Sequence, residues 1–439
     1  MALQTVGRTR CNHAATHANH ADRDRDARRN VMRRLGRCVL VALAGTALAC
    51  ASESRRTDGT GVRDTLPNGT IVVRYDRRPE PAAGPLEPDL SIGVVEGDPH
   101  LVFGDVRGIE ADRDGTIYVL DYQASEIRAF DAEGRFLRTL TRKGQGPGEL
   151  TEANGMILVG DSVLWIQDHG KGRMIAMDLQ GEELARVPMH VRSYGYIWSG
   201  TIDHRRRFWK PTFHSDEPSV WPPSEGLQES RSRGYLKSYD PATDVADSVY
   251  LGEQPWRSFI ARNSRGGYSY YTIPNDPRTI TIVDPAGGFW QASGTSYRIA
   301  RLDEQGDTTL VIEVAGEPVL VTEEGRQRYV DLSSESSRVD RRVAEEIAAL
   351  MPAAKQAISQ LVVDDRGRLW ARRTSADGEV ATYDVFAPDG EHVGTVTLTF
   401  EPSQYLPLRI RHGRVYALVR DSLDVPAVVR TGPIPLEGW

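Results

Sequence analysis

The glycine-rich stretch from Lys143 to Leu150, KGQGPGEL, has a composition suited to phosphate binding, because a lysine stands beside several glycines. A P-loop, however, requires the order Gly-x-x-x-x-Gly-Lys-Ser/Thr between a strand and a helix. Here the lysine precedes the glycines, and strand-like segments lie on both sides. We therefore interpret this stretch as a sharp connection between strands, in which glycine permits positive φ and Pro147 restricts the chain.

Metal binding is a second chemistry that the N-terminal residues suggest. Four potential ligands occur there: Cys11, His13, His17 and His20. Met32, however, begins a complete signal peptide by itself, so we interpret residues 1–31 as a non-structural or mis-assigned extension rather than a metal site. Motifs for hydrolysis are also missing beyond residue 31, where the sequence contains neither a Gly-x-Ser-x-Gly elbow nor a His-x-x-x-His pair.

Residues 32–50 have the order of a secretory signal peptide, with three arginines, the short apolar run Val39–Ala49 and small residues before a cut. The run is too short to span a membrane, which takes about 20 apolar residues. The end of this segment, Ala-Leu-Ala-Cys, resembles the lipobox of bacterial lipoproteins, which implies lipidation at Cys50. By that resemblance, Ala51 after the cysteine implies delivery to the outer membrane or cell surface. We then expect residues 51–69 to form a flexible tether. Ordinary signal cleavage beside an incidental cysteine is the alternative.

The charge balance limits the partners. The chain has a net charge of −7, from 54 basic and 61 acidic residues. Residues 1–50 contain nine Arg and three Asp, so the remainder has 45 basic and 58 acidic residues, a net charge of −13. An acidic domain does not suit the phosphate backbone of nucleic acid. We expect no nucleic-acid partner, a monomer, and membrane contact only through the lipid anchor.

A repeated pattern organises the rest of the chain. The segment from Gly108 to Leu140 has apolar and polar residues in alternation, interrupted by Asp-Gly and Glu-Gly turns, which predicts four antiparallel strands. The same order recurs, and each copy has an aromatic residue near the start of its second strand. These residues are Tyr118, Trp165, Trp209, Trp290, Trp370 and Tyr416. Their intervals of 47, 44, 81, 80 and 46 residues fit units of about 40–50 residues, two of which contain insertions.

Six such units predict an all-β protein, a six-bladed β-propeller of four-stranded antiparallel blades over residues 70–439. Radial packing buries both faces of every sheet, so the six aromatic residues become packing residues between blades. The last unit lacks an outer strand. Residues 70–76 and 90–95 are strand-like, and we expect one or both to complete the last blade.

The first unit, including its IYV-x-D core, its FD-x-x-G turn and its GPGE loop, closely resembles NHL repeats. Residues 70–434 resemble the exported bacterial six-bladed propellers that contain such repeats, often as lipoproteins. The third and sixth units match this pattern weakly. The resemblance implies a platform that binds a protein, peptide or glycan, and it implies no reaction.

Two insertions interrupt the repeat. The first includes Trp256, Tyr268, Tyr270 and Tyr271, which are candidate ligand-stacking residues, although we favour a structural role, in which they cover a blade face or form an extra strand. The second spans about residues 323–357. Its segment 341–351 has apolar residues at helical spacing and predicts an amphipathic helix that lies across a mouth or flank of the propeller, or simply covers exposed strand.

Three functions follow. We favour a non-catalytic binding platform anchored in the cell envelope, exported to the outer membrane, periplasm or surface. The alternative is a metal-dependent propeller hydrolase or lyase, and the third is a structural role in an envelope complex. A carboxylate ring at the central axis would bind Ca²⁺ and three His would bind Zn²⁺. Only Asp121 and Asp168 end equivalent strands, since later units have Pro211 and Ala292 there, so we expect no cofactor.

We predict that Cys50→Ser abolishes lipid attachment. Cells fed radiolabelled palmitate should label the wild-type chain and leave the variant unlabelled, because the thiol is the acylated group. Label retained by the variant would contradict lipidation at Cys50, whereas cleavage without label in both chains would indicate an ordinary secretory signal.

Overall fold

The computed structural model describes residues 61–78, 84–188, 200–215, 221–263, 265–335, 339–376 and 380–436. These residues lie in the compact unit Ser54–Trp439. Half of the structure is strand and 7% is helix. The predicted extension, the signal peptide and Cys50 lie outside the described residues. Among the described residues, no helix is long and apolar enough to cross a membrane.

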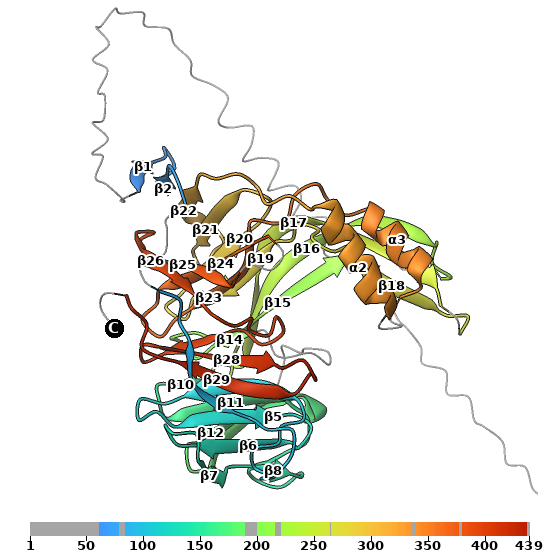
Figure 1. Ribbon diagram of the computed structural model, residues 1–439. Helices are drawn as coiled ribbons and strands as arrows, with labels where there is room; N and C mark the ends of the chain where they lie inside the picture. The colour runs from blue at the N-terminus through green and yellow to red at the C-terminus, as the bar shows by residue number, and fades with distance from the viewer. Residues whose placement is uncertain are drawn as a thin grey trace, which may run out of the picture. The chain divides into compact units, whose positions relative to one another are not determined.

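The strands form six antiparallel blades, as predicted (Figure 1). Blade 1 contains β4 (Val106–Ala111), β5 (Ile117–Asp121), β6 (Glu126–Phe130) and β7 (Phe136–Thr139); blade 2 contains β10 (Ala153–Val159), β11 (Val163–Asp168), β12 (Arg173–Asp178) and β13 (Glu183–Pro188). Blade 3 contains β14 (Thr201–Ile202), β15 (Phe208–Ser215), β16 (Gly226–Asp240), β17 (Val245–Arg262) and a fifth strand, β18 (Tyr268–Thr272). The short 3-10 helix η1 (His169–Lys171) connects β11 to β12.

The remaining blades are built in the same order. Blade 4 contains β19 (Ile280–Val283), β20 (Phe289–Ala292), β21 (Tyr297–Leu302) and β22 (Thr308–Val314); blade 5 contains β23 (Ile358–Val363), β24 (Leu369–Arg373), β25 (Thr382–Phe386) and β26 (His392–Thr397). Blade 6 contains β27 (Arg409–Arg411), β28 (Arg414–Arg420), β29 (Pro426–Thr431) and β3 (Pro88–Ile92). The weakly matching third and sixth units are therefore complete blades.

The N-terminal strands join two different blades. β3 pairs with β29 and completes blade 6, which confirms the prediction for the segment that begins at Leu90. β2 (Ile71–Tyr75) instead lies parallel to β22 of blade 4, because that sheet has an open outer edge to pair with. β1 (Val62–Thr65) pairs with β2, so the predicted tether 51–69 is too long at its C-terminal end.

The KGQGPGEL segment is a connection between blades, with two short parallel strands, β8 (Arg142–Lys143) and β9 (Glu149–Leu150). Gly148 has a φ of +69°. The Glu149 carboxylate accepts a hydrogen bond from the Gly146 amide at 2.8 Å. This contact closes the loop on itself, and the Gly148 amide donates to Glu183 of blade 2 at 2.8 Å, so these polar groups hold the connection in place.

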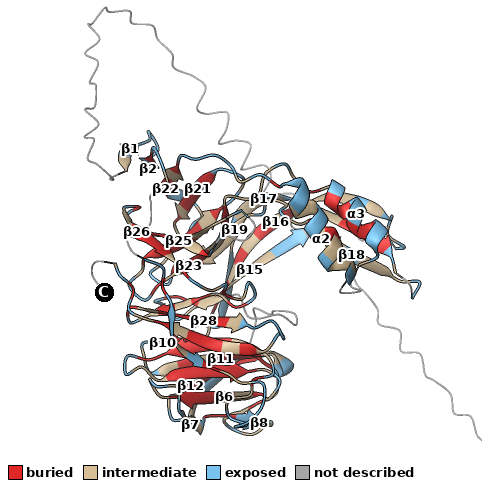
Figure 2. Cartoon of the chain, viewed as in Figure 1, coloured by how far each residue is buried: buried red, intermediate tan, exposed pale blue. Residues whose placement is uncertain are grey.

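The repeated aromatic residues pack between successive blades, as predicted. Five of them are at most 3% exposed, and Trp165 is partly buried. Tyr118 contacts residues of blade 2, while Trp209 contacts residues of blade 4. Tyr416 of blade 6 contacts Ile109 and Ile117 of blade 1, which closes the ring. Figure 2 shows that the strands of the blades contain most of the buried positions.

A buried aspartate holds the aromatic residue in four blades. In blade 5, Asp364 Oδ1 accepts the backbone N–H groups of Arg366 and Arg368 at 2.9 Å, and its Oδ2 accepts the Trp370 indole N–H at 2.9 Å. The same arrangement occurs in three further pairs: Asp112 with Tyr118, Asp203 with Trp209, and Asp284 with Trp290. One carboxylate therefore determines both the turn and the ring position.

Aspartates also begin the outer turns, between the third and fourth strands, as expected from turn chemistry. Asp131, Asp178, Asp240 and Asp303 each accept a hydrogen bond from a backbone N–H two residues later. These carboxylates support turns and do not meet at an axis.

The two sequence insertions meet in space and form one accessory layer. The outer halves of β16 and β17 extend beyond β15 and pair with each other and with β18. Two helices, α2 (Glu323–Glu335) and α3 (Arg341–Ala349), lie beside β18 (Figure 1). The Asp340 side chain accepts the Arg342 amide and caps α3, which confirms the predicted helix. Helix α2 was not predicted from the sequence.

We predict that Asp364→Ala lowers the free energy of unfolding by about 3 kcal/mol, because the Trp370 N–H and two turn amides lose a buried acceptor. Chemical denaturation of the purified chain measures this loss. Asp131→Ala is the matched control, since Asp131 caps an equivalent turn but is exposed and contacts no aromatic ring; its effect should be smaller. Equal losses in the two variants would contradict a role for the buried ring contact.

Candidate binding surface

The accessory sheet has two different faces, which the strand register defines. Cross-strand partners in an antiparallel sheet point to the same side. Arg262 is opposite Tyr268, and Ile260 is opposite Tyr270. Trp256 is separated from Ile260 and Arg262 by even numbers of residues on β17, so it shares their side. We call the side with Trp256, Tyr268 and Tyr270 the aromatic face.

The helix pair covers the opposite face. Phe259 and Ala261 of β17 pack against Val343 and Ile347 of α3, and Tyr271 packs against this cluster. Arg257 points to the same side, since it is an odd number of residues from Trp256. Its Nη1 donates to Asp276 Oδ1 at 2.7 Å, and its Nη2 donates to the Leu350 carbonyl at 3.2 Å. The helices therefore support the sheet from behind.

The aromatic face exposes several of its rings to solvent, while Ile260 on the same side is buried. Tyr270 is 62% exposed and Trp256 is 38% exposed. Trp221, which is 76% exposed, lies edge-on to Tyr268 with ring centroids 5.6 Å apart. Arg262 Nη2 donates to the Tyr268 hydroxyl at 3.0 Å, which orients that ring. The Arg278 guanidinium lies 4.7 Å from the centroid of the Trp256 ring.

The structure thus places three of the four predicted residues on one exposed face: Trp256, Tyr268 and Tyr270. Tyr271 lies on the opposite side, where the helices cover it, because side chains alternate along a strand. Trp221 was missed in the sequence analysis. In the sequence, Trp221 is notable only as an aromatic residue in a Pro- and Ser-rich segment. Because this segment has no strand periodicity, the sequence does not assign Trp221 to a face of the sheet.

The two carboxylates that end equivalent strands support local structure. Asp121 accepts the backbone N–H groups of Gly104 and Asp105, and Asp168 accepts the Thr151 hydroxyl at 2.6 Å. Arg173 Nε donates to Asp168 Oδ2 at 2.8 Å. Over the described part of the chain, no group of three or more His, Cys, Asp or Glu side chains has a metal-binding arrangement.

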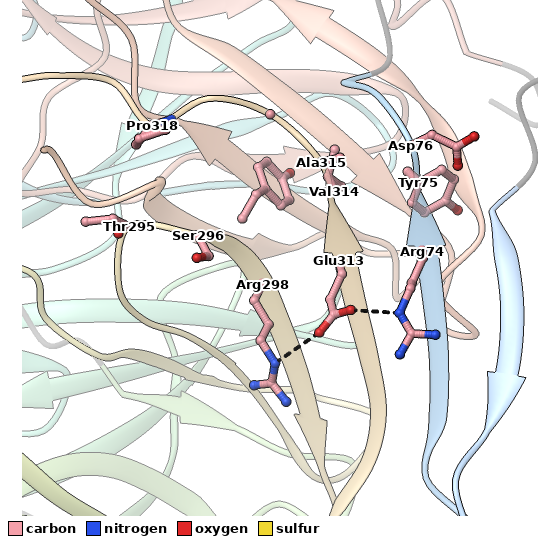
Figure 3. Close-up of a pocket in the computed structure, with 12 residues that line it drawn as sticks. Arg74, Tyr75, Asp76, Thr295, Ser296, Arg298, Glu313, Val314, Ala315 and Pro318 are labelled. Carbon is pink, nitrogen blue, oxygen red and sulfur yellow. Dashed lines mark hydrogen bonds and ion pairs between the residues drawn. The ribbon is translucent and has the colours of Figure 1, made fainter.

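A cavity of about 620 Å³ lies at the outer edge of blade 4, between β2, β21 and β22 (Figure 3). Its lining includes Glu313, which stands between Arg74 Nε at 3.0 Å and Arg298 Nε at 3.5 Å. Arg74 Nη1 also lies 3.7 Å from Asp64 Oδ2, so the two guanidinium groups are balanced by two carboxylates and leave no surplus positive charge. This makes the cavity a weaker candidate than the aromatic face.

One wall of this cavity is tied to a buried polar network. The Tyr297 hydroxyl donates to Asp384 Oδ2 at 2.7 Å, and Arg373 Nε donates to the same oxygen at 2.8 Å. Burial alone would raise the pKa of Asp384, but hydrogen bonds from His392 and Arg373 bring it below its ordinary value. A depressed carboxyl pKa stabilises the fold above about pH 4, and this contribution is lost as the pH falls through the folded-state pKa.

Comparison with known proteins agrees with this architecture. Residues 100–207 match the family model DUF5128, described as a 6-bladed β-propeller. These residues include blades 1 and 2. No curated protein is significantly similar to the chain in sequence. The chain is a six-bladed β-propeller.

Three solved structures with similar folds differ widely in what they are named for. A presumed exported protein of Bacteroides fragilis has 11% identity, a TM-score of 0.43, and coverage of 82% of this chain and 99% of its own. Virginiamycin B lyase of Staphylococcus aureus has 9% identity, a TM-score of 0.37, and coverage of 78% and 98%. The calcium-binding protein regucalcin of Agrobacterium tumefaciens has 12% identity, a TM-score of 0.35, and coverage of 80% and 99%. At these identities the similarity concerns the fold, and it transfers no activity to this chain.

We predict that truncation of Tyr271 destabilises the fold more than truncation of its neighbour Tyr270. Tyr271→Ala should lower the free energy of unfolding by about 1–2 kcal/mol, because its ring packs against the helix pair. Tyr270→Ala should change it by less than about 0.5 kcal/mol, since that ring is solvent-exposed. Urea denaturation of both variants measures the difference, and equal values would show that the two faces are misassigned.

Proposed function

We propose that this protein is an exported, lipid-anchored β-propeller that binds a protein, peptide or glycan of the bacterial envelope. The observation that supports a binding role is the aromatic face, a set of exposed Trp and Tyr rings on a sheet held rigid by helices. Large exposed rings provide contact area at low cost in conformational entropy. Interfaces concentrate their binding energy in such residues.

The neighbouring groups fit recognition better than bond-breaking chemistry. The hydroxyl groups of Tyr268 and Tyr270 and the guanidinium groups of Arg262 and Arg278 offer hydrogen bonds at the rim of an apolar surface. Aromatic centres with polar rims are typical of protein surfaces that bind partners. Because Arg262 and the helix pair already hold the sheet and the Tyr268 ring, little ordering should be needed on binding.

The location follows from the N-terminal sequence. The signal-like segment 32–50 supports export, and Cys50 supports attachment through lipid. The segment between Cys50 and β1 would then link the anchor to the propeller, so the membrane contact is made by lipid alone. This arrangement would leave the aromatic face available to envelope components.

We predict that the double variant Trp256→Ala/Tyr270→Ala loses an envelope ligand that the wild type retains. Each exposed ring should contribute about 1–2 kcal/mol of binding free energy, so affinity should fall at least about tenfold. Separate protein and polysaccharide fractions of envelope extracts, passed over the immobilised chains, would identify the ligand class. Tyr250→Ala is the control, because Tyr250 is 50% exposed on the same hairpin but lies before the accessory segment.

An identical set of retained components for the double variant and the wild type would contradict the proposal. Metal analysis of the purified protein tests the alternative function. A stoichiometric Ca²⁺ or Zn²⁺ ion would favour the metal-dependent hydrolase or lyase over the binding platform.

A further inference from the structure

The six inner turns, which connect the first and second strands of each blade, lie at one end of the blades and contact one another. The His204 amide of blade 3 donates to the Pro285 carbonyl of blade 4 at 2.8 Å. The Asp365 amide of blade 5 donates to the Ile410 carbonyl of blade 6 at 3.3 Å. We call the surface formed by these turns the inner mouth. Its central residues are 113–114, 160–162, 204–206, 285–286, 365–366 and 411–412.

The inner mouth is basic, although the chain is acidic. Its central residues include five Arg and three Asp, together with two His, so the turns have an excess of two positive charges with both His neutral. The outer turns at the same end have the opposite character. Their corresponding central residues, 132–134, 179–181, 241–243, 304–306 and 388–390, contain three carboxylates and no Arg or Lys. Positive charge is therefore confined to the centre.

A partly buried carboxylate holds part of this basic centre in place. Asp161 of blade 2 accepts a hydrogen bond from Arg411 Nη2 at 2.7 Å, and His412 Nε2 lies 3.3 Å from the same oxygen. Arg113 of blade 1 lies 3.3 Å from the second oxygen. Burial would raise the pKa of Asp161, but Arg411 and His412 bring it below its ordinary value. Three blades are joined here around one ionised carboxylate.

One turn places an arginine where blades 1, 4 and 5 have glycine. Arg206 has a φ of +63°, a backbone conformation that side chains other than Gly rarely adopt. Arg206 is three residues after the buried aspartate of its turn. In blades 1, 4 and 5 the same position is occupied by Gly115, Gly287 and Gly367, all with positive φ. A glycine at this position would relieve the backbone strain. The presence of an arginine instead indicates that its side chain has a function.

The Arg206 side chain is available for that use. It is exposed, and among the described residues its guanidinium makes no hydrogen bond or ion pair. Its neighbour Arg205 behaves differently, since Nη1 donates to Glu304 Oε2 at 3.1 Å. This pair shows that a carboxylate already fits beside the turn.

We propose that the inner mouth binds a short acidic segment of a partner protein, with Arg206 as a principal contact. Arginine forms its strongest hydrogen bonds with carboxylates, and the mouth already holds internal ones. A short segment meets only the basic centre. A membrane surface or a long polyanion would also cover the acidic outer turns, where like charges repel it. The proposal concerns a surface separate from the aromatic face.

The test uses the full lipoprotein in neutral detergent and a fluorescent peptide of six glutamates. Fluorescence anisotropy should show binding that weakens with added salt. Arg206→Gly should weaken it about threefold to tenfold, and Arg113→Ser/Arg206→Gly should weaken it further. Arg206→Gly relieves backbone strain, so the melting temperature should stay the same or rise, which separates lost contact from lost folding.

Arg135→Ser is the matched control, because Arg135 is an exposed arginine of an outer turn, and it should leave peptide affinity unchanged. Trp256→Ala should also leave it unchanged, so failure here is distinguishable from failure of the aromatic face. Absence of peptide binding, or equal weakening by Arg135→Ser, would overturn the proposal. Tighter binding of polygalacturonate or of vesicles with anionic headgroups would overturn it in favour of those partners.

Discussion

The hydrogen bonds that Asp112, Asp203, Asp284 and Asp364 accept constrain both a turn and an aromatic ring in four blades. Each carboxylate accepts one or two backbone N–H groups of its turn through one oxygen, and the O–H or N–H of an aromatic side chain six residues later through the other. The ring is thereby fixed at the height where it meets the next blade. A buried polar group that is fully hydrogen-bonded specifies geometry as well as stability, because any other arrangement leaves it without partners. Core packing between blades depends on this local device.

Blades 2 and 6 lack this arrangement, and their shorter turns supply other contacts. The residues that replace it are Asp161 in blade 2, and Arg411 and His412 in blade 6, and they bind one another near the inner mouth. Two contacts therefore close the propeller. One is the packing of Tyr416 on blade 1, and the other is this ion pair across the turns. Where the local constraint is missing, a contact between different blades takes its place.

The accessory layer shows how a propeller can gain a surface without changing its blades. Strands β16 and β17 continue beyond blade 3, and the helices inserted between blades 4 and 5 cover one side of the extension. The other side retains exposed rings. The carboxylates at strand ends and in turns accept hydrogen bonds from neighbouring groups of the protein. Aromatic and guanidinium groups are therefore the principal surface chemistry at the two proposed sites.

The sequence by itself determined the number of blades, the register of the aromatic residues, the closing role of the strand at Leu90 and the helix near residues 341–349. These features depend on period-two or helical spacing and on turn residues, which act over a few positions. Tertiary structure alone decided that β2 joins blade 4, that Tyr271 is covered while Tyr270 is exposed, that Trp221 lies by Tyr268, and that basic turns gather at one mouth. Those outcomes require pairing between residues far apart in the chain, and local spacing contains no information about which distant edge, helix or turn will be adjacent.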